Sequence, residues 1–117
     1  MTAPETNANQ PQGKPKNRRE MLEQFVAGHP DDAFARYGLA MECMRLGDNP
    51  AAEAHFKQLM SSHPDYVASY FPFGQMLAKL GRAAEARRIL AAGVERAAAT
   101  GDGHARSEMQ VALDELD

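Results

Sequence analysis

The sequence is poor in the features that mark disulfide-bonded, zinc-binding or membrane-spanning chains. Its one cysteine, Cys43, excludes an intrachain disulfide and a zinc site built from several thiolates. No apolar run approaches the roughly 20 residues that a membrane-spanning helix needs, so membrane insertion is not expected. The first residues also lack the apolar centre of a secretory signal, and we therefore expect a cytoplasmic protein.

Signatures of catalysis are missing as well. The sequence contains no phosphate-binding glycine loop and no nucleophile elbow. Two of its four histidines, His29 and His63, occupy repeated positions, and none lies at the spacing of a metal-ligand motif. The sequence therefore predicts a protein that is not an enzyme and has no catalytic residue, cofactor or metal site.

The charge balance is ordinary for a soluble protein. A formal net charge of -3 gives no global attraction to nucleic acid or anionic lipid, so no nucleic-acid partner is expected. Residues 1–17 hold almost no large apolar side chain, and we interpret them as a disordered N-terminal tail. A local basic cluster lies where this tail meets the first helix. It is interpreted as solubilising, with contact to RNA, lipid or an acidic protein as the alternative: Lys14, Lys16, Arg18 and Arg19.

What the sequence does contain is an internal repeat. The tripeptide His29-Pro30-Asp31 returns thirty-four residues later as His63-Pro64-Asp65. The same offset relates Leu46 to Leu80, Gly47 to Gly81, Ala52 to Ala86, and Tyr37 to Phe71. A period of this length is typical of arrays of helical hairpins, which bury a continuous core by stacking.

Apolar periodicity and breakers predict the helices within each repeat. In the first, apolar residues recur at helical spacing before Gly47, and a second helix runs from Ala51 to Ser62. The apolar residues of the first helix are Leu39, Ala40, Cys43 and Leu46. The second repeat follows the same plan around Gly81, except that Pro72 predicts either a kink or a late start of its first helix.

The remaining segments read as half-units. We expect a half-repeat helix over 18–28, repeat one over 31–64, repeat two over 65–100 and a C-terminal capping helix over 103–116. Together, residues 18–117 form one helical domain. Two full hairpins and two half-units reach the number of repeats at which stacking sustains itself.

In this arrangement the residues resemble the tetratricopeptide repeat family, and small standalone bacterial members in particular. Its pattern is a large aromatic, Leu-Gly, Tyr, Ala, Phe and a closing Pro. The first repeat departs from it at Arg36, which stands at the aromatic position, and the second at Ala98, which replaces the closing Pro. The matching residues are Leu39-Ala40, Cys43, Ala52, Phe56 and Pro64 in the first repeat, and Tyr70, Phe73-Gly74, Leu77, Ala86 and Leu90 in the second.

The resemblance implies an all-α fold, a right-handed α-solenoid of stacked antiparallel helical hairpins. It also implies that the first helix of each hairpin lines a concave face. A second apolar stripe, beside the core stripe, lies on these helices and predicts a partner-binding groove, since aromatics and methionines suit an apolar or amphipathic ligand. The predicted groove residues are Phe34, Tyr37, Met41, Met44, Phe71, Gln75 and Met109.

Two functions follow from this stripe. In the first, the protein is a non-catalytic scaffold that binds a peptide or helix of a partner protein in the groove. In the alternative, the protein is a homo-oligomerising structural module, such as a homodimer, and another copy fills its apolar groove.

Overall fold

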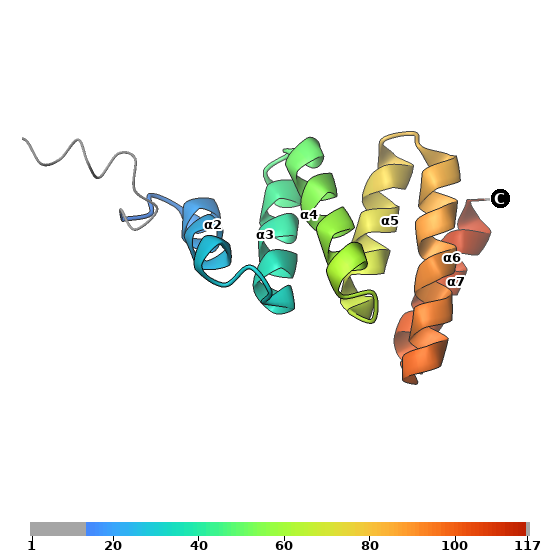
Figure 1. Ribbon diagram of the computed structural model, residues 1–117. Coiled ribbons are helices and arrows are strands. Elements are labelled where there is room, and N and C mark those ends of the chain that lie inside the picture. Colours follow the sequence, from blue (N-terminus) through green and yellow to red (C-terminus); the bar gives the residue numbers. More distant parts are fainter. Residues whose placement is uncertain (1–13, 117) are drawn as a thin grey trace, which may run out of the picture.

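The computed structural model describes residues 14–116, so most of the predicted tail lies outside the described residues. Within that range the chain forms six α-helices and one short 3-10 helix and contains no strand, which confirms the all-α prediction. Figure 1 shows α2 to α6 following one another in a row, with α7 behind α6. Their bounds are α2 (Arg18–Gly28), α3 (Ala33–Arg45), α4 (Asn49–Ser62), η1 (Val67–Ser69), α5 (Tyr70–Lys79), α6 (Ala83–Thr100) and α7 (Gly103–Glu115).

Two helical hairpins make up the middle of the row. α3 packs along α4 and α5 along α6, while α2 flanks α3 and α7 flanks α6. Each hairpin turns at a glycine in the left-handed conformation, Gly47 with φ 82° and Gly81 with φ 80°. The Gly47 amide donates to the Met44 carbonyl, and the Gly81 amide donates to the Ala78 carbonyl. Glycine is needed here because a side chain strains this backbone.

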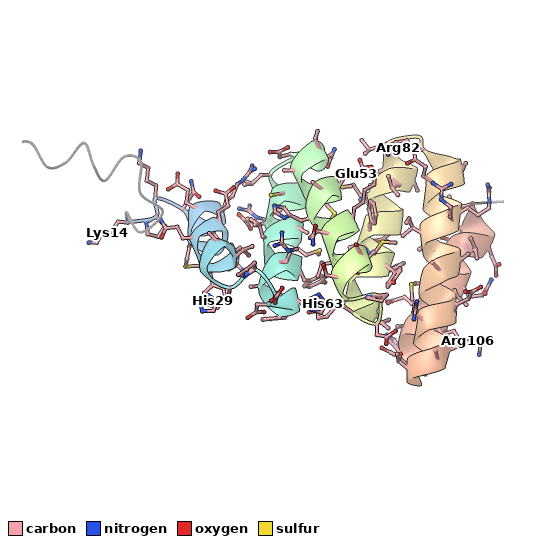
Figure 2. All side chains as sticks on the ribbon, viewed as in Figure 1. Lys14, His29, Glu53, His63, Arg82 and Arg106 are labelled. Carbon is pink, nitrogen blue, oxygen red and sulfur yellow. The ribbon has the colours of Figure 1, made fainter. Side chains whose placement is uncertain are left out.

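The repeated His-Pro-Asp tripeptides mark the ends of equivalent helices. His29 follows α2 and His63 follows α4, and Figure 2 shows both on the lower side of the row of helices. Each histidine amide donates to a carbonyl four residues earlier, Phe25 for His29 and Leu59 for His63. The two residues therefore terminate helices in the same way.

Pro72 is accommodated by a late start of its helix. The segment Val67–Ser69 forms one 3-10 turn, and the α-helix begins only at Tyr70. Pro72 then lies in the first turn of α5, where an amide proton has no partner within the helix. Of the two outcomes that the sequence predicted, the structure shows the late start.

The core runs between the hairpins and centres on a pair of aromatic rings. Phe56 of α4 and Phe73 of α5 stack with their ring centroids 5.1 Å apart and their planes 14° apart. Cys43 is buried beside them in the same cluster, and burial raises the pKa of its thiol. Leu46, the last of the apolar residues at helical spacing in this helix, lies outside the core, because it is the C-cap of α3 and is 51% exposed.

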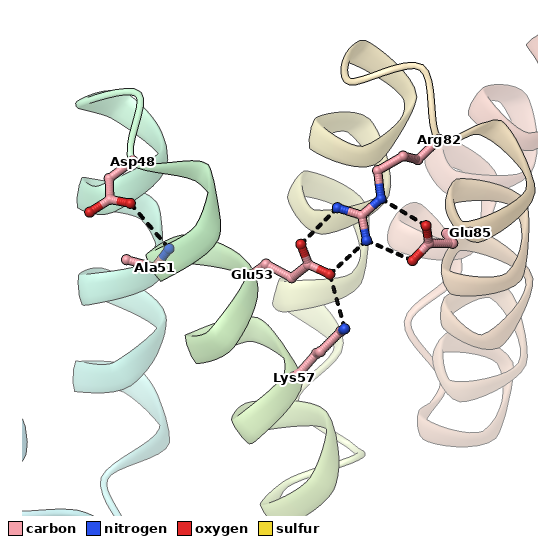
Figure 3. A network of polar contacts seen from close by, with 6 residues as sticks. All are labelled: Asp48, Ala51, Glu53, Lys57, Arg82 and Glu85. Carbon is pink, nitrogen blue, oxygen red and sulfur yellow. Dashed lines mark hydrogen bonds and ion pairs between the residues drawn. The ribbon is translucent and has the colours of Figure 1, made fainter.

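A polar contact joins each hairpin to the next. Arg82, in the turn before α6, donates two 2.8 Å hydrogen bonds to the Glu53 carboxylate on α4 and pairs with Glu85. Lys57 approaches Glu53 to 2.9 Å (Figure 3). Together these donors lower the pKa of Glu53 to about 2, Arg82 having the larger effect.

The same two positions meet one unit earlier with their charges exchanged. Arg19 on α2 donates a 2.9 Å hydrogen bond to the carboxylate of Asp48, in the turn before α4. Arg19 and Glu53 are thirty-four residues apart, as are Asp48 and Arg82. We call the pairs Arg19–Asp48 and Glu53–Arg82 the inter-unit clasps. At the third equivalent position Arg87 donates to the backbone carbonyl of Leu116 over 3.4 Å.

The Glu53–Arg82 clasp should make the protein less stable in acid. Because the folded-state pKa of Glu53 lies below its ordinary value of 4.5, its contribution is fully present above about pH 4.5 and is lost as the pH falls toward 2. We expect Glu53→Gln to lower the free energy of unfolding by about 1 to 2 kcal/mol at pH 7. Hydrogen bonds to charged groups contribute about 1.5 to 3 kcal/mol, and the partial exposure of Arg82 to solvent reduces this contribution. Urea denaturation from pH 7 to pH 2 should show the two proteins converging.

The matched control is Glu108→Gln. Glu108 is an exposed carboxylate on α7 that lies 4.0 Å from the imidazole of His104. A constant difference between wild type and Glu53→Gln across the whole pH range would contradict the stated role of the Glu53 carboxylate.

Candidate partner-binding groove

The predicted second stripe of α3 lines a groove next to α2. Phe34 is 72% exposed, whereas Tyr37, Met41 and Met44 are half-buried and form the floor. Arg18 of α2 contributes to the opposite wall. The hollow has a volume of about 770 Å³, large enough for several side chains of a ligand.

Two smaller hollows extend this surface across the row. Met44 and Arg45 also line a hollow of about 290 Å³ against α5, together with Gln75 and Lys79. Gln75 and Lys79 in turn line a third hollow of about 200 Å³, whose far wall is α7. Because neighbouring hollows share residues, α3, α5 and α7 present one continuous surface.

The structure separates the seven predicted groove residues into four groups, the last of which is Met109 alone. Phe34, Tyr37, Met41 and Met44 share the first hollow, and Gln75 is exposed between the other two. Phe71 is half-buried and packs against the core cluster around Tyr70, Leu90 and Met109. It lies on the predicted line but does not line the three hollows described above.

Met109 is the predicted groove residue that the structure contradicts. It is 0% exposed and packs beneath Gly93, so it belongs to the core. The error is one of register, because α6 has 18 residues where α4 has 14, and an offset of thirty-four no longer applies to α7. Counted from their N-caps, Asp32 and Asp102, Met109 corresponds to buried Leu39.

The same count identifies the residue of α7 that corresponds to Met41 of α3. Val111 stands nine residues after the N-cap Asp102, as Met41 stands nine residues after Asp32. It is 57% exposed. The sequence does carry a signal for this register: in both helices the N-cap carboxylate accepts from an alanine amide three residues on, Ala35 and Ala105.

One carboxylate is buried in the wall of the first hollow. Glu42 is 5% exposed and accepts hydrogen bonds of 3.1 and 2.6 Å from the guanidinium of Arg45. Arg18 approaches the same carboxylate to 3.5 Å. The Arg45 bonds are the main reason that the pKa of Glu42 lies below its ordinary value. Two arginines thus share one carboxylate, and both remain about two-thirds exposed.

No helix within residues 14–116 has the length and apolar character needed to cross a membrane. In the same range, histidine, cysteine and acidic side chains do not gather in groups of three or more that could hold a metal ion.

Comparison with known proteins agrees with this architecture. The sequence profile of the tetratricopeptide repeat family matches residues 44–105. A tetratricopeptide repeat domain protein from Salinibacter ruber, solved by NMR, is 34% identical, with a TM-score of 0.72 over 75% of this chain and 89% of that one. Its crystal structure gives a TM-score of 0.69 at 34% identity, over 73% and 96% of the two chains.

A protein from Bordetella parapertussis, solved in solution, is 27% identical, with a TM-score of 0.74 over 86% of this chain and 88% of that one. No curated protein matches the chain.

The helices and their pairwise packing define an all-α solenoid of stacked helical hairpins. With the profile match and the related structures, this chain belongs to the tetratricopeptide repeat family. Domains of this family generally mediate protein–protein interaction and generally act as scaffolds rather than as catalysts.

Proposed function

We propose that this protein is an interaction scaffold that binds a peptide or helix of a partner protein along α3, α5 and α7. The observation that carries the proposal is the exposure of Phe34, which is 72% exposed and lines the first hollow. A large aromatic next to adaptable methionines is typical of surfaces that bind apolar side chains.

The half-buried neighbours support the same interpretation. The ring of Tyr37 is held by Tyr66, with centroids 5.6 Å apart, so part of the groove floor is fixed before a ligand arrives. A preformed floor reduces the entropy lost on binding. Met41 and Met44, which are unbranched, adapt to the shape of the ligand.

Phe34→Ala is expected to abolish partner capture without affecting the fold. Removal of an aromatic anchor costs about 2 kcal/mol of binding free energy, which corresponds to roughly a thirtyfold loss of affinity. Because the side chain is mostly exposed, the free energy of unfolding should change by less than about 0.5 kcal/mol. Partners captured from native cell extract by the full chain are quantified by mass spectrometry.

Phe25→Ala is the matched control, since Phe25 is 45% exposed on α2 but does not line the groove. Circular dichroism confirms that both variants are folded. An unchanged set of captured partners with Phe34→Ala would contradict the proposal.

The alternative occupant is a second copy of the chain. It is favoured by the exposed apolar face of α2, where Met21 and Phe25 are 49% and 45% exposed. Light scattering coupled to size exclusion separates the two functions. If the wild type is a dimer and Phe34→Ala is a monomer, the groove is filled by another copy; if both are monomers at tens of micromolar, it is not.

A further inference from the structure

We infer that the segment bound in the groove is acidic and amphipathic, with carboxylates that lie along one row of basic side chains. This inference rests on the proposed function and adds the chemistry of the partner. The apolar floor of the groove binds the hydrophobic face of the ligand. The charged wall favours a ligand whose polar face carries the opposite charge.

The row of charges follows the repeat register. Arg45 on α3 and Lys79 on α5 are thirty-four residues apart and occupy equivalent positions. Arg45 lines the first two hollows, and Lys79 lines the second and third. Arg18 extends the row at the α2 end. Equivalent residues on successive helices face the same side of a repeat array, so these cations are presented together.

The row keeps a positive excess after its internal pairing. The first two hollows are lined by the three cations and by a single carboxylate, that of Glu42. Lys79 forms no ion pair with any residue between 14 and 116. The groove is therefore positive at this end, whereas the chain as a whole carries a formal charge of -3.

At the opposite end of the row, the position equivalent to Arg45 carries a carboxylate. Glu115 on α7 stands thirteen residues after Asp102, as Arg45 stands thirteen residues after Asp32, and it lines the third hollow. The change of sign gives the ligand a direction: its acidic part lies over α3 and α5, and a neutral or basic part lies over α7.

Two other occupants fit this surface less well. A nucleic acid strand carries one charge at every phosphate and would meet Glu115 with the wrong sign. A second copy would have to offer an acidic apolar helix, and its acidic α7 exposes one large apolar side chain, Val111. A partner protein can supply both apolar anchors and carboxylates on one short helix.

The test is selection from a library of random peptides of about 12 residues, a length that spans about 18 Å as a helix. The library is selected for binding to the full wild-type chain and, separately, to each of three variants. Phe34→Ala removes the apolar anchor and Lys79→Glu reverses one charge of the row. Arg88→Glu is the control, because Arg88 is an exposed cation on α6 outside the hollows.

The expected wild-type pool is enriched in apolar residues at helical spacing and in aspartate and glutamate. The best acidic peptide, labelled and measured by fluorescence anisotropy, should bind Lys79→Glu about fivefold more weakly at low salt and Arg88→Glu equally well. Added salt should shrink the difference, since it screens exposed charges.

Each other outcome overturns a defined part of the argument. An apolar pool without acidic enrichment contradicts the charge inference and leaves the scaffold function standing. A pool that is no more enriched on the wild type than on Phe34→Ala contradicts both. An acidic preference that survives in Lys79→Glu, or tighter binding of an oligouridine strand than of the acidic peptide, also overturns the inference.

Discussion

Phe56→Ala is expected to lower the free energy of unfolding by about 4 kcal/mol, a large share of the 5 to 15 kcal/mol that holds a typical domain together. The side chain is 0% exposed and stacks on Phe73, which is 1% exposed. Its removal forfeits the transfer free energy of the ring, leaves a cavity and ends the aromatic contact. Because this pair joins α4 to α5, the two hairpins of the variant should no longer unfold as one cooperative unit.

Urea denaturation followed by circular dichroism measures the loss, and Phe25→Ala supplies the matched control on an exposed phenylalanine. The double variant Phe56→Ala/Phe73→Ala should cost clearly less than the two single variants combined, because both single variants break the same contact. A loss below about 1 kcal/mol for Phe56→Ala would show that the core does not depend on this pair.

Gly93→Ala should destabilise the protein by about 2 to 3 kcal/mol, although alanine normally favours a helix over glycine by about 1 kcal/mol. Gly93 lies inside α6, and an added Cβ would come within 2.7 Å of the Cβ of Tyr70 and would overlap the sulfur of Met109. The Met109 side chain can turn aside, but the Tyr70 Cβ is fixed to the backbone of α5. The packing of α5 and α7 on α6 must therefore open.

Gly38→Ala provides the matched control with the opposite expected sign. Gly38 lies inside α3, and its added Cβ would meet Leu22 at 3.6 Å, an ordinary contact. This variant should gain up to about 1 kcal/mol from helix propensity. Thermal denaturation of the two variants compares them directly, and a gain in Gly93→Ala would refute the close approach of α6 to its neighbours.

The repeat made the architecture predictable because one offset fixes breakers, small residues and large residues together. Gly47 and Gly81 both end a helix in the left-handed conformation, as their shared position indicated. Pro72 left two outcomes open, since sequence alone does not say whether a helix bends or begins late. The preceding 3-10 turn, Val67–Ser69, resolved that choice.

The misplacement of Met109 shows where periodicity stops being informative. Because α6 is one turn longer than α4, the residues of α7 no longer follow the thirty-four-residue offset. Positions in α7 match those in α3 only when they are counted from the N-cap, Asp102. The assignment of Phe34 and its neighbours to a partner groove stays a prediction, because burial and shape describe a surface without its ligand. The pairing of Glu53 with Arg82 could not be predicted from the sequence, because it joins a helix to the turn of the next hairpin, twenty-nine residues away.

The exchanged charges of the inter-unit clasps restrict how such an array can grow. Tandem duplication of the first hairpin alone would set Glu53 of one copy beside Asp48 of the next, two like charges. Duplication of the second hairpin alone would set Arg87 beside Arg82. Duplication of both hairpins together would instead set Arg87 beside Asp48, an opposite pair. The array can therefore lengthen by two hairpins at a time with its clasps intact, but not by one.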